Sequence, residues 1–284
     1  AMATLRVTSR FFSNSPSEFP FSDVVMDWQV LERSRSTFQV SEGVGSLTFG
    51  GAGFQYRGRG DVTDVTAGRI SSIEYEVSGE TVFTFTNVRK SAEKVFDYVY
   101  DDFNVFTPEG QRPIAYLLSG TDRIFGGGEK DTLNGYRGND RMSGGGDDDI
   151  LRGDRGNDRL TGGLGFDQLT GGGGRDSFVF NTPAASLGAG NYTNFDTITD
   201  FNRRDDRILI DNDAFAGLGR AGRLGARFEV AEDATKAGTR IFHDRTGLEA
   251  GIYFDPDGNG SAEAVLIAQV TSGLTLSAPD FLVI

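Results

Sequence analysis

The sequence of 284 residues predicts an all-β protein in three parts. A nine-residue repeat fills the middle of the chain and leaves room only for short strands between glycine-rich turns. Before the repeat, stretches such as SLTFGGAGFQYRG and IEYEVSGETVFTFTNV alternate polar and apolar residues. After it, TRIFHD, AGIYFD and AVLIAQV do the same. We therefore expect a repeat region at residues 113–180, between a β-rich domain at 1–112 and a β-rich cap at 181–284.

Read in nines from Leu117, the repeat occurs seven times. Its sixth position is always aspartate: Asp122, Asp131, Asp140, Asp149, Asp158, Asp167 and Asp176. Its eighth position is always apolar: Ile124, Leu133, Met142, Leu151, Leu160, Leu169 and Phe178. A flexible glycine-rich linker does not hold two positions in strict register, so the segment must be folded.

Each repeat resembles the nonapeptide of the RTX family, and the resemblance implies a turn followed by a very short strand. Glycine in the turn permits positive φ and lets backbone carbonyls converge on an ion, and alternation in the strand sends the eighth side chain inward. So short a strand is not stable alone. Stacked coils about 4.8 Å apart bury the eighth positions as one thin core.

The pattern G-G-x-G-x-D-x-U-x resembles the calcium-binding repeat of the RTX family. The resemblance implies a parallel calcium β-roll in which two successive repeats form one coil. Calcium is then the expected cofactor, held by the seven aspartates and by glycine carbonyl oxygens. The candidate glycines are Gly126, Gly128, Gly144, Gly146, Gly153, Gly162, Gly171 and Gly173.

A coil made of two repeats places the aspartates in two rows, one from odd repeats and one from even repeats. Stacked carboxylates repel each other, and a hard cation between successive carboxylates removes that repulsion. A ligand set of oxygen atoms alone is typical of calcium. Successive aspartates in the same row allow about five ions, whose charge of about +10 would offset most of the formal net charge of −13.

Some repeats depart from the pattern. Leu117 and Leu118 replace both leading glycines, so we expect the first repeat to cap the roll and to bind less well. Other residues replace glycine at the second and fourth positions, where aspartate tolerates a left-handed backbone better than glutamate or tyrosine. These residues are Tyr136, Asp154, Glu129 and Asp147. The best sites are expected near Asp149, Asp158, Asp167 and Asp176.

Arginine recurs on one predicted face of the roll. Arg123, Arg141 and Arg159 occupy the seventh position of alternate repeats, and Arg137 and Arg155 occupy the third. Like charges stacked in a sheet are destabilising, so this arginine ladder is a candidate binding surface for an acidic polysaccharide. The alternative is a solvated face whose arginines pair with nearby turn aspartates.

The segment NYTNFDTITDFNRRDDRILIDN resembles the one that follows the repeats in secreted RTX proteases. It supplies weaker candidate ligands for calcium, with acidic turn residues as the alternative. These candidates are Asp196, Asp200, Asp206 and Asp211.

Further on, Asp255, Asp257 and Asn259 have the spacing of an EF-hand loop, but Leu266 stands where a bidentate glutamate is needed. We therefore expect a hairpin turn there first, and a weak calcium site second.

The last residues, Asp280-Phe-Leu-Val-Ile284, resemble the type I secretion signal of RTX proteases. The resemblance implies export by the type I secretion machinery to an extracellular or cell-surface location. Residues 1–20 lack the charged and apolar regions of a signal peptide, and no stretch approaches the roughly 18 apolar residues of a transmembrane segment.

Composition excludes several functions. There is no cysteine and only one histidine, His243, so thiolate chemistry and multi-histidine zinc sites are excluded. With polar neighbours, His243 is expected at the surface. The 41 acidic residues against 28 basic ones argue against nucleic acid as a partner and favour cations.

The β-rich domain at 1–112 carries no recognisable catalytic motif. Its sequence predicts a hairpin turning at Ser78-Gly79 and a short helix over residues 92–102 capped by Ser91. Glu74 and Glu76 share one strand face and form a possible carboxylate pair for glycoside chemistry, although exposed alternation explains them better.

The sequence thus favours a secreted, non-enzymatic calcium-binding protein with a role in cell-surface or matrix adhesion, or in binding acidic polysaccharide. One alternative is a polysaccharide lyase, epimerase or glycosidase that uses carboxylates of the first domain. Another is a calcium-triggered folding tail that carries the first domain as a passenger.

Overall fold

The computed structural model describes residues 4–7, 12–13, 29–33, 37–42, 45–59, 62–77, 80–91, 118–182, 194–230, 238–245, 250–258, 264–271 and 273–284. Apart from two short 3₁₀ turns, their regular structure is all β, as expected. The chain forms two compact units, residues 1–141 and 142–284, with the boundary inside β10 (Arg141–Gly145).

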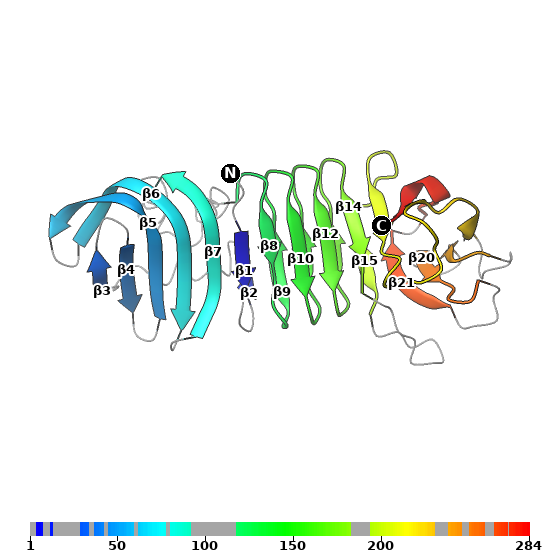
Figure 1. Cartoon of the computed structure of the whole chain (residues 1–284), viewed down its shortest axis with the longest axis horizontal. Helices are drawn as coiled ribbons and strands as arrows, with labels where there is room; N and C mark the ends of the chain where they lie inside the picture. Colours follow the sequence, from blue (N-terminus) through cyan, green and yellow to red (C-terminus); the bar gives the residue numbers. More distant parts are fainter. Residues whose placement is uncertain are drawn as a thin grey trace. The chain divides into compact units, whose positions relative to one another are not determined.

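The first unit is built mainly on an antiparallel sheet (Figure 1). Its strand order is β3-β4-β5-β6-β7-β1-β8. The bounds are β1 (Thr4–Val7), β3 (Gln29–Arg33), β4 (Thr37–Glu42), β5 (Gly45–Arg59), β6 (Val62–Val77), β7 (Glu80–Ser91) and β8 (Arg123–Phe125). A second pair joins β2 (Phe12–Ser13) to β9 (Asp131–Asn134). Phe49, Ile70, Ile73 and Val88 are buried in this unit.

The predicted hairpin at Ser78-Gly79 is confirmed, because β6 and β7 are antiparallel and Val77 pairs with Glu80. The short helix expected over residues 92–102 lies outside the described residues. The first repeat joins the N-terminal sheet, since β8 pairs in parallel with β1, and the Lys90 ammonium donates to the Ser119 hydroxyl at 2.9 Å. Leu118, which replaces a leading glycine, is buried. These contacts support the capping role expected of the first repeat.

The second unit begins with parallel strands of the repeats. They are β11 (Ile150–Arg152), β12 (Arg159–Gly163), β13 (Gln168–Thr170) and β14 (Ser177–Phe180). Even repeats pair with even repeats, so Leu151 faces Leu169, and odd repeats pair with odd, so Leu160 faces Phe178. Because every second repeat pairs in parallel, two repeats make one coil, and the β-roll expected from the sequence is confirmed.

The eighth positions form the core of the roll in both units. All seven side chains, from Ile124 to Phe178, have an exposed fraction of 0%. The predicted inward direction of this position is therefore correct in every repeat.

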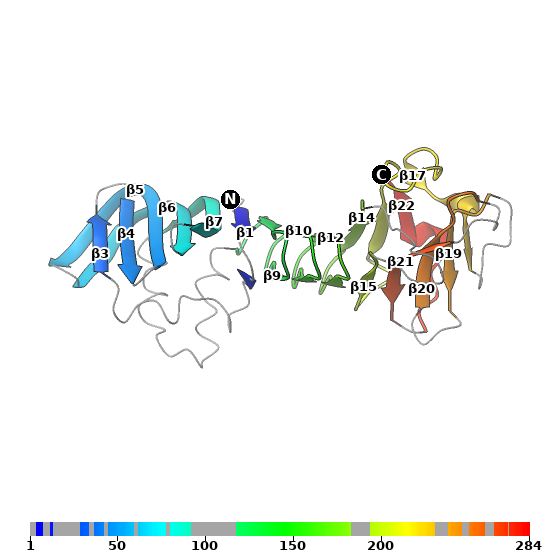
Figure 2. The ribbon, with the colours of Figure 1, turned by 90° about the horizontal axis from the view of Figure 1, so that it is seen from below.

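The roll continues beyond the seventh repeat (Figures 1 and 2). β15 (Asp196–Ile198) pairs in parallel with β13, and β16 (Arg207–Ile210) pairs in parallel with β14. β21 (Val265–Val270) and β22 (Phe281–Val283) then extend the two sheets. Figure 2 shows β14 and β22 in one layer and β15 and β21 in the other. Ile198, Ile208 and Phe281 are fully buried, so they prolong the core column without belonging to the nonapeptide pattern.

The cap is made of β17 (Gly222–Arg223), β18 (Phe228–Val230), β19 (Ile241–Asp244) and β20 (Ala250–Phe254), with 3₁₀ turns at Gly225–Arg227 and Ala278–Asp280. The strands expected at TRIFHD, AGIYFD and AVLIAQV are confirmed as β19, β20 and β21, which are consecutive and antiparallel. Aromatic pairs stabilise the cap, among them Phe215 with Phe254 at 5.3 Å between ring centroids.

His243 is buried, and the expectation of a surface residue was wrong. It lies on β19 opposite Ile252, and its Nδ1 accepts a hydrogen bond from the Leu276 backbone N–H at 3.3 Å. Burial, with repulsion from Arg245, lowers the pKa of His243 to about 4. Ile241 and Phe242 are buried as well, so β19 is covered on both faces and His243 is buried despite its polar sequence neighbours.

We expect the cap to lose stability on acidification through His243. Its folded-state pKa of about 4 lies below the ordinary value of 6.5, so its contribution is complete above pH 6.5 and disappears as the pH falls toward 4. A His243→Gln variant should show a shallower fall of melting temperature over this range in saturating calcium. Since the chain has no other histidine, equal slopes for both proteins would contradict this assignment.

Candidate metal centre

The sixth-position aspartates are buried although they are charged residues. All seven have exposed fractions of 1–3%, and each stands at or just before the start of a roll strand. Burying an ionised carboxylate is costly unless hydrogen bonds or a cation compensate it. The surroundings of these carboxyl groups therefore decide what the roll binds.

A ladder of hydrogen bonds joins aspartates of the same row. The backbone N–H of one aspartate donates to Oδ1 of the next aspartate in its row, with a nitrogen–oxygen distance of 2.8 Å for Asp122 with Asp140, Asp149 with Asp167, and Asp158 with Asp176. We call this series the Oδ1 ladder. It places successive carboxyl groups of one row next to each other, as predicted from a coil of two repeats.

The second carboxylate oxygen has a different environment. Oδ2 of Asp167 and Oδ2 of Asp176 are buried and accept no hydrogen bond from the described residues. An acceptor that is buried without a donor is unfavourable, and it is well suited to bind a cation.

Glycine at the first position of a repeat leaves space beside this oxygen. A Cβ atom on Gly153 would lie 2.4 Å from Asp158 Oδ2 and 2.6 Å from the Gly171 carbonyl oxygen of the next coil. A Cβ on Gly144 would likewise lie 2.1 Å from Asp149 Oδ2 and 2.8 Å from the Gly162 carbonyl oxygen. One carboxylate oxygen and one carbonyl oxygen thus meet at a point that any larger side chain would obstruct.

The turns of repeats three to seven share one backbone conformation, with positive φ at the second and fourth positions. Three of these residues are not glycine: Tyr136, Asp147 and Asp154 have φ of 65°, 63° and 68°. Tyrosine therefore adopts the left-handed conformation that we expected it to tolerate poorly. Glu129, at a fourth position, does not have positive φ.

The first two repeats have different turns. Oδ2 of Asp122 accepts the Gly120 N–H at 3.2 Å, and Oδ2 of Asp131 accepts the Gly127 N–H at 2.7 Å. Their carboxylates are thus satisfied within the turn. This arrangement supports the expectation that the better sites lie toward Asp149, Asp158, Asp167 and Asp176.

Burial and mutual repulsion disfavour the charged form of the carboxyl groups at the end of the roll. Burial raises the pKa of Asp176 to about 6, and repulsion from Asp206 and Asp200 adds to this effect. Burial likewise raises the pKa of Asp167 to about 6. Burial and the charge of Asp167 raise the pKa of Asp196. A bound cation would reverse these effects, because it favours the ionised form.

The donor set fits calcium. The described residues contain no group of three or more histidine, cysteine, aspartate or glutamate side chains able to hold a metal ion by themselves. An ion here would need backbone carbonyls beside the carboxylates, and this all-oxygen set is typical of calcium. Gly144, Gly153, Gly162 and Gly171 line the spaces just described, whereas the Gly173 carbonyl accepts the Gly156 N–H. Gly146 lies in the turn of the fourth repeat, and Gly126 and Gly128 lie in the different turn of the second repeat; all three stay predictions as ligands.

The weaker candidate ligands fall into two groups. Asp196 and Asp206 extend the Oδ1 ladder, accepting the backbone N–H of Asp167 at 3.4 Å and of Asp176 at 2.9 Å. Asp211 and Asp255 instead accept backbone N–H groups of their own turns.

The turn at Asp255 also receives a positive charge, because the Arg240 guanidinium donates to the Asp255 and Pro256 carbonyls. That positive charge favours the turn interpretation over a cation site at Asp255 and Asp257, and Asn259 lies outside the described residues.

The fifth position was missed as a structural determinant. Asp148 Oδ1 accepts the Phe166 N–H at 3.0 Å, and Asn157 Oδ1 accepts the Arg175 N–H at 2.8 Å, so this position also links successive coils. Asn194 Oδ1 binds the Gly165 N–H in a related way. The signal was present in the sequence as asparagine or aspartate in the three consecutive repeats three to five.

The arginine ladder begins the strands of odd repeats. Arg123 and Arg141 are exposed at the first residues of β8 and β10, and the Arg141 N–H donates to the Asp122 carbonyl. In the second unit, Arg159 pairs with Ser177, which pairs with Arg207. Arg137 and Arg155 are exposed in the turns. Cationic side chains therefore recur on the outer face of this sheet within each unit.

A family model matches the repeat region. Residues 117–151 and 152–181 match the family model of the RTX calcium-binding nonapeptide repeat. No curated protein sequence matches the chain significantly.

Two solved structures from Azotobacter vinelandii are similar to part of the chain. The AlgE6R2 subunit of a mannuronan C5-epimerase is 27% identical, with 56% of this chain and 91% of that chain covered and a TM-score of 0.39. The AlgE6R3 subunit is 28% identical, with 57% and 72% covered and a TM-score of 0.27.

Proposed function

From residues 117–181, which are RTX calcium-binding nonapeptide repeats, we propose that the protein is secreted, folds when it meets extracellular calcium, and has no catalytic activity. The observation that supports this best is the pair of aspartate rows buried along the roll. Calcium would supply the positive charge that the buried carboxylates lack. We propose about five ions in the roll, one between each two successive aspartates of a row.

Folding on calcium fits an export route that carries an unfolded chain. Extracellular calcium modules typically have dissociation constants of about 10⁻⁴–10⁻³ M, so they remain empty at low cytosolic calcium and fill outside. The carboxylate repulsion would keep the empty repeats from folding before export. The terminal Asp280-Phe-Leu-Val-Ile284 supports type I secretion as this route. No helix among the described residues is long and apolar enough to cross a membrane.

The arginine ladder supports an acidic polysaccharide, in the matrix or on a cell surface, as the extracellular ligand. Guanidinium groups bind carboxylates in a bidentate manner. Arg123 and Arg141 are exposed at the starts of β8 and β10 in the first unit, where they would be available to a uronate polymer. Calcium would contribute indirectly, because it neutralises the acidic rows that otherwise repel such a polymer.

The polysaccharide proposal is tested with Arg123→Ser, Arg141→Ser and Arg159→Ser combined in one variant. We expect its retention on an immobilised uronate polymer, in calcium and at low salt, to fall about tenfold or more, because three charge-assisted contacts of about 1.5–3 kcal/mol are removed. Arg220→Ser with Arg223→Ser, which removes exposed arginines of the cap, is the matched control. Equal retention of ladder variant and wild type would disprove a role for the ladder.

The enzyme alternative is tested on the same polymers. Glu74 and Glu76 are both half-buried on β6, and the Thr81 hydroxyl donates to Glu74 Oε1 at 3.4 Å. We expect no release of reducing ends or unsaturated uronate from a panel of acidic polysaccharides. Product release that is lost in Glu74→Gln would instead favour a lyase or glycosidase.

A further inference from the structure

We propose that the segment after the nonapeptide repeats completes two further calcium sites, one between Asp176 and Asp206 and one between Asp167 and Asp196. The inference rests on the proposed calcium binding of the roll and extends it past residue 181, where the match to the repeat family ends. It also assigns the ions that would join the roll to the cap.

The Oδ1 ladder carries the first step of this inference. Within the repeats, Asp176 accepts a hydrogen bond from the N–H of Asp158, which lies 18 residues earlier. Asp206 accepts the N–H of Asp176 in the same way, at a separation of 30 residues. Asp196 accepts the N–H of Asp167, at a separation of 29 residues. Asp206 and Asp196 both lie at or next to the first residue of a parallel strand, β16 or β15. They are therefore the structural continuation of the two aspartate rows.

The direction of Oδ2 carries the second step. In the fifth repeat, a Cβ atom on Gly153 would lie close both to Asp158 Oδ2 and to the Gly171 carbonyl oxygen of the following coil, so this Oδ2 lies on the side of its turn that faces forward along the roll. Asp176 Oδ2 has the same position beside Gly171, at 2.6 Å from the point where a Cβ would lie. By analogy with Asp158 Oδ2, we infer that it faces the coil that contains Asp206. Asp176 is 1% exposed, and its Oδ2 accepts no hydrogen bond from the described residues.

A third carboxylate distinguishes the site at Asp206 from those in the repeats. The N–H of Gly153 donates to the Thr170 carbonyl, whereas the N–H groups of Gly171 and Gly172 donate to the Asp200 carboxylate at 2.9 and 2.7 Å. Asp200 thus lies over the turn that carries Asp176. The negative charges of Asp200, Asp206 and Asp176 act on one another here. A divalent cation is the group that would offset them.

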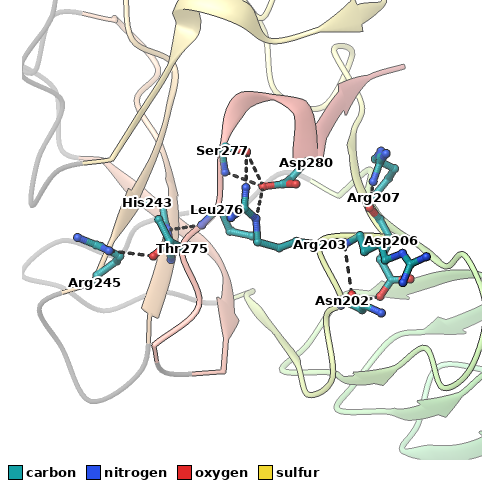
Figure 3. A network of polar contacts seen from close by, with 11 residues as sticks. Asn202, Arg203, Asp206, Arg207, His243, Arg245, Thr275, Leu276, Ser277 and Asp280 are labelled. Atoms are coloured by element: carbon teal, nitrogen blue, oxygen red, sulfur yellow. Dashed lines mark hydrogen bonds and ion pairs between the residues drawn. The ribbon is translucent and has the colours of Figure 1, made fainter.

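The turn from Asn202 to Asp206 connects this site to the end of the chain (Figure 3). The Asn202 N–H donates to Asp206 Oδ2 at 2.8 Å. Its neighbour Arg203 reaches away and forms an ion pair with Asp280 at 3.0 Å, and donates to the Ser277 hydroxyl at 2.7 Å. Calcium at Asp206 would therefore order the turn that holds the 3₁₀ turn before β22.

The test is a count of bound calcium ions by equilibrium dialysis of the full chain. Asp206→Asn and Asp196→Asn keep the oxygen that accepts the ladder hydrogen bond but remove the charge. We expect each variant to bind one ion fewer than the wild type and the double variant two fewer. Asp205→Asn is the matched control, because Asp205 is adjacent and acidic but outside the ladder, and it should bind the full number.

The outcomes separate this inference from the proposed function. Full stoichiometry in both Asp206→Asn and Asp196→Asn would overturn the two additional sites, while the repeats would still bind calcium. Absence of calcium binding in the wild type would overturn the proposed function itself. If Asp206→Asn does not fold, Asp200→Asn, at the exposed edge of the same site, replaces it. We expect this variant to bind calcium about tenfold more weakly at one site. Unchanged calcium affinity at every site would contradict the inference.

Discussion

Chelation of calcium with EDTA is expected to unfold the roll of residues 118–182. Each ion adds about 2.7 kcal/mol to stability when calcium is about 100-fold above its dissociation constant, so five ions contribute about as much as the whole stability of an ordinary domain, roughly 5–15 kcal/mol. Without them, the buried aspartates repel one another. Circular dichroism should show loss of β signal, and the melting transition should disappear or fall by more than about 20 °C.

The same experiment on Asp167→Asn combined with Asp176→Asn distinguishes calcium binding from nonspecific stabilisation by salt. Asparagine removes charge at two buried positions, so this variant should melt higher than the wild type in EDTA and lower than the wild type in calcium. Magnesium at equal concentration is the control for ionic strength, because it dehydrates reluctantly and prefers an octahedral site. A wild-type protein that stays compact and ordered in EDTA would disprove the proposed role of the aspartate rows.

The second large effect is expected from Gly174→Ala in the turn of the seventh repeat. Gly174 has φ of +148°, and a Cβ added to it would lie 1.7 Å from the Gly156 carbonyl oxygen of the preceding coil. The coils would have to separate, and the turn would be strained as well, so we expect a loss of about 2–5 kcal/mol in the free energy of unfolding. Thermal melting in saturating calcium measures it.

Gly173→Ala is the matched control for this prediction. Gly173 is the adjacent residue, it does not have positive φ, and the nearest atom to its added Cβ is 3.9 Å away. Its substitution should change stability by no more than about 1 kcal/mol. Equal effects of the two substitutions would mean that glycine content, and not the close approach of coils, determines the stability of the turn.

The repeat region could be predicted from sequence because its two periodic positions have one physical role each. Leu160 and its equivalents must be inside, and Asp158 and its equivalents must be polar turn residues, so the buried positions followed from periodicity. The pairing of every second repeat and the two aspartate rows were implied by the resemblance to the RTX family. The extension of the roll could not be read in the same way. Asp196 lies 29 residues after Asp167, and Asp206 lies 30 residues after Asp176, so neither keeps the spacing of 18 residues found in the repeats. Only the three-dimensional register shows that they continue the rows.

The cap and the N-terminal domain were predicted only as alternating strands. His243 was misplaced because β19 is buried on both faces, with Phe242 and His243 both inside, and the polar residues next to His243 do not indicate this. The parallel pairing of β1 with β8 joins Thr4 to Arg123, which are far apart in sequence, and no local pattern near Thr4 indicates it. Pairing between distant strands depends on the whole topology, so composition and turn signals do not determine it.

The Oδ1 ladder gives the roll a polarity. Every bond runs from the N–H of an earlier coil to the carboxylate of a later one, so the two ends of the stack are chemically unequal. Removing the final coil would leave the backbone N–H of the preceding aspartate buried without an acceptor. Removing the first coil would instead leave a carboxylate oxygen without its donor, and water or an ion can bind to that oxygen. Assembly that starts at the carboxyl-terminal end would therefore always offer the next coil a ready acceptor, which gives the stack a preferred sense of growth.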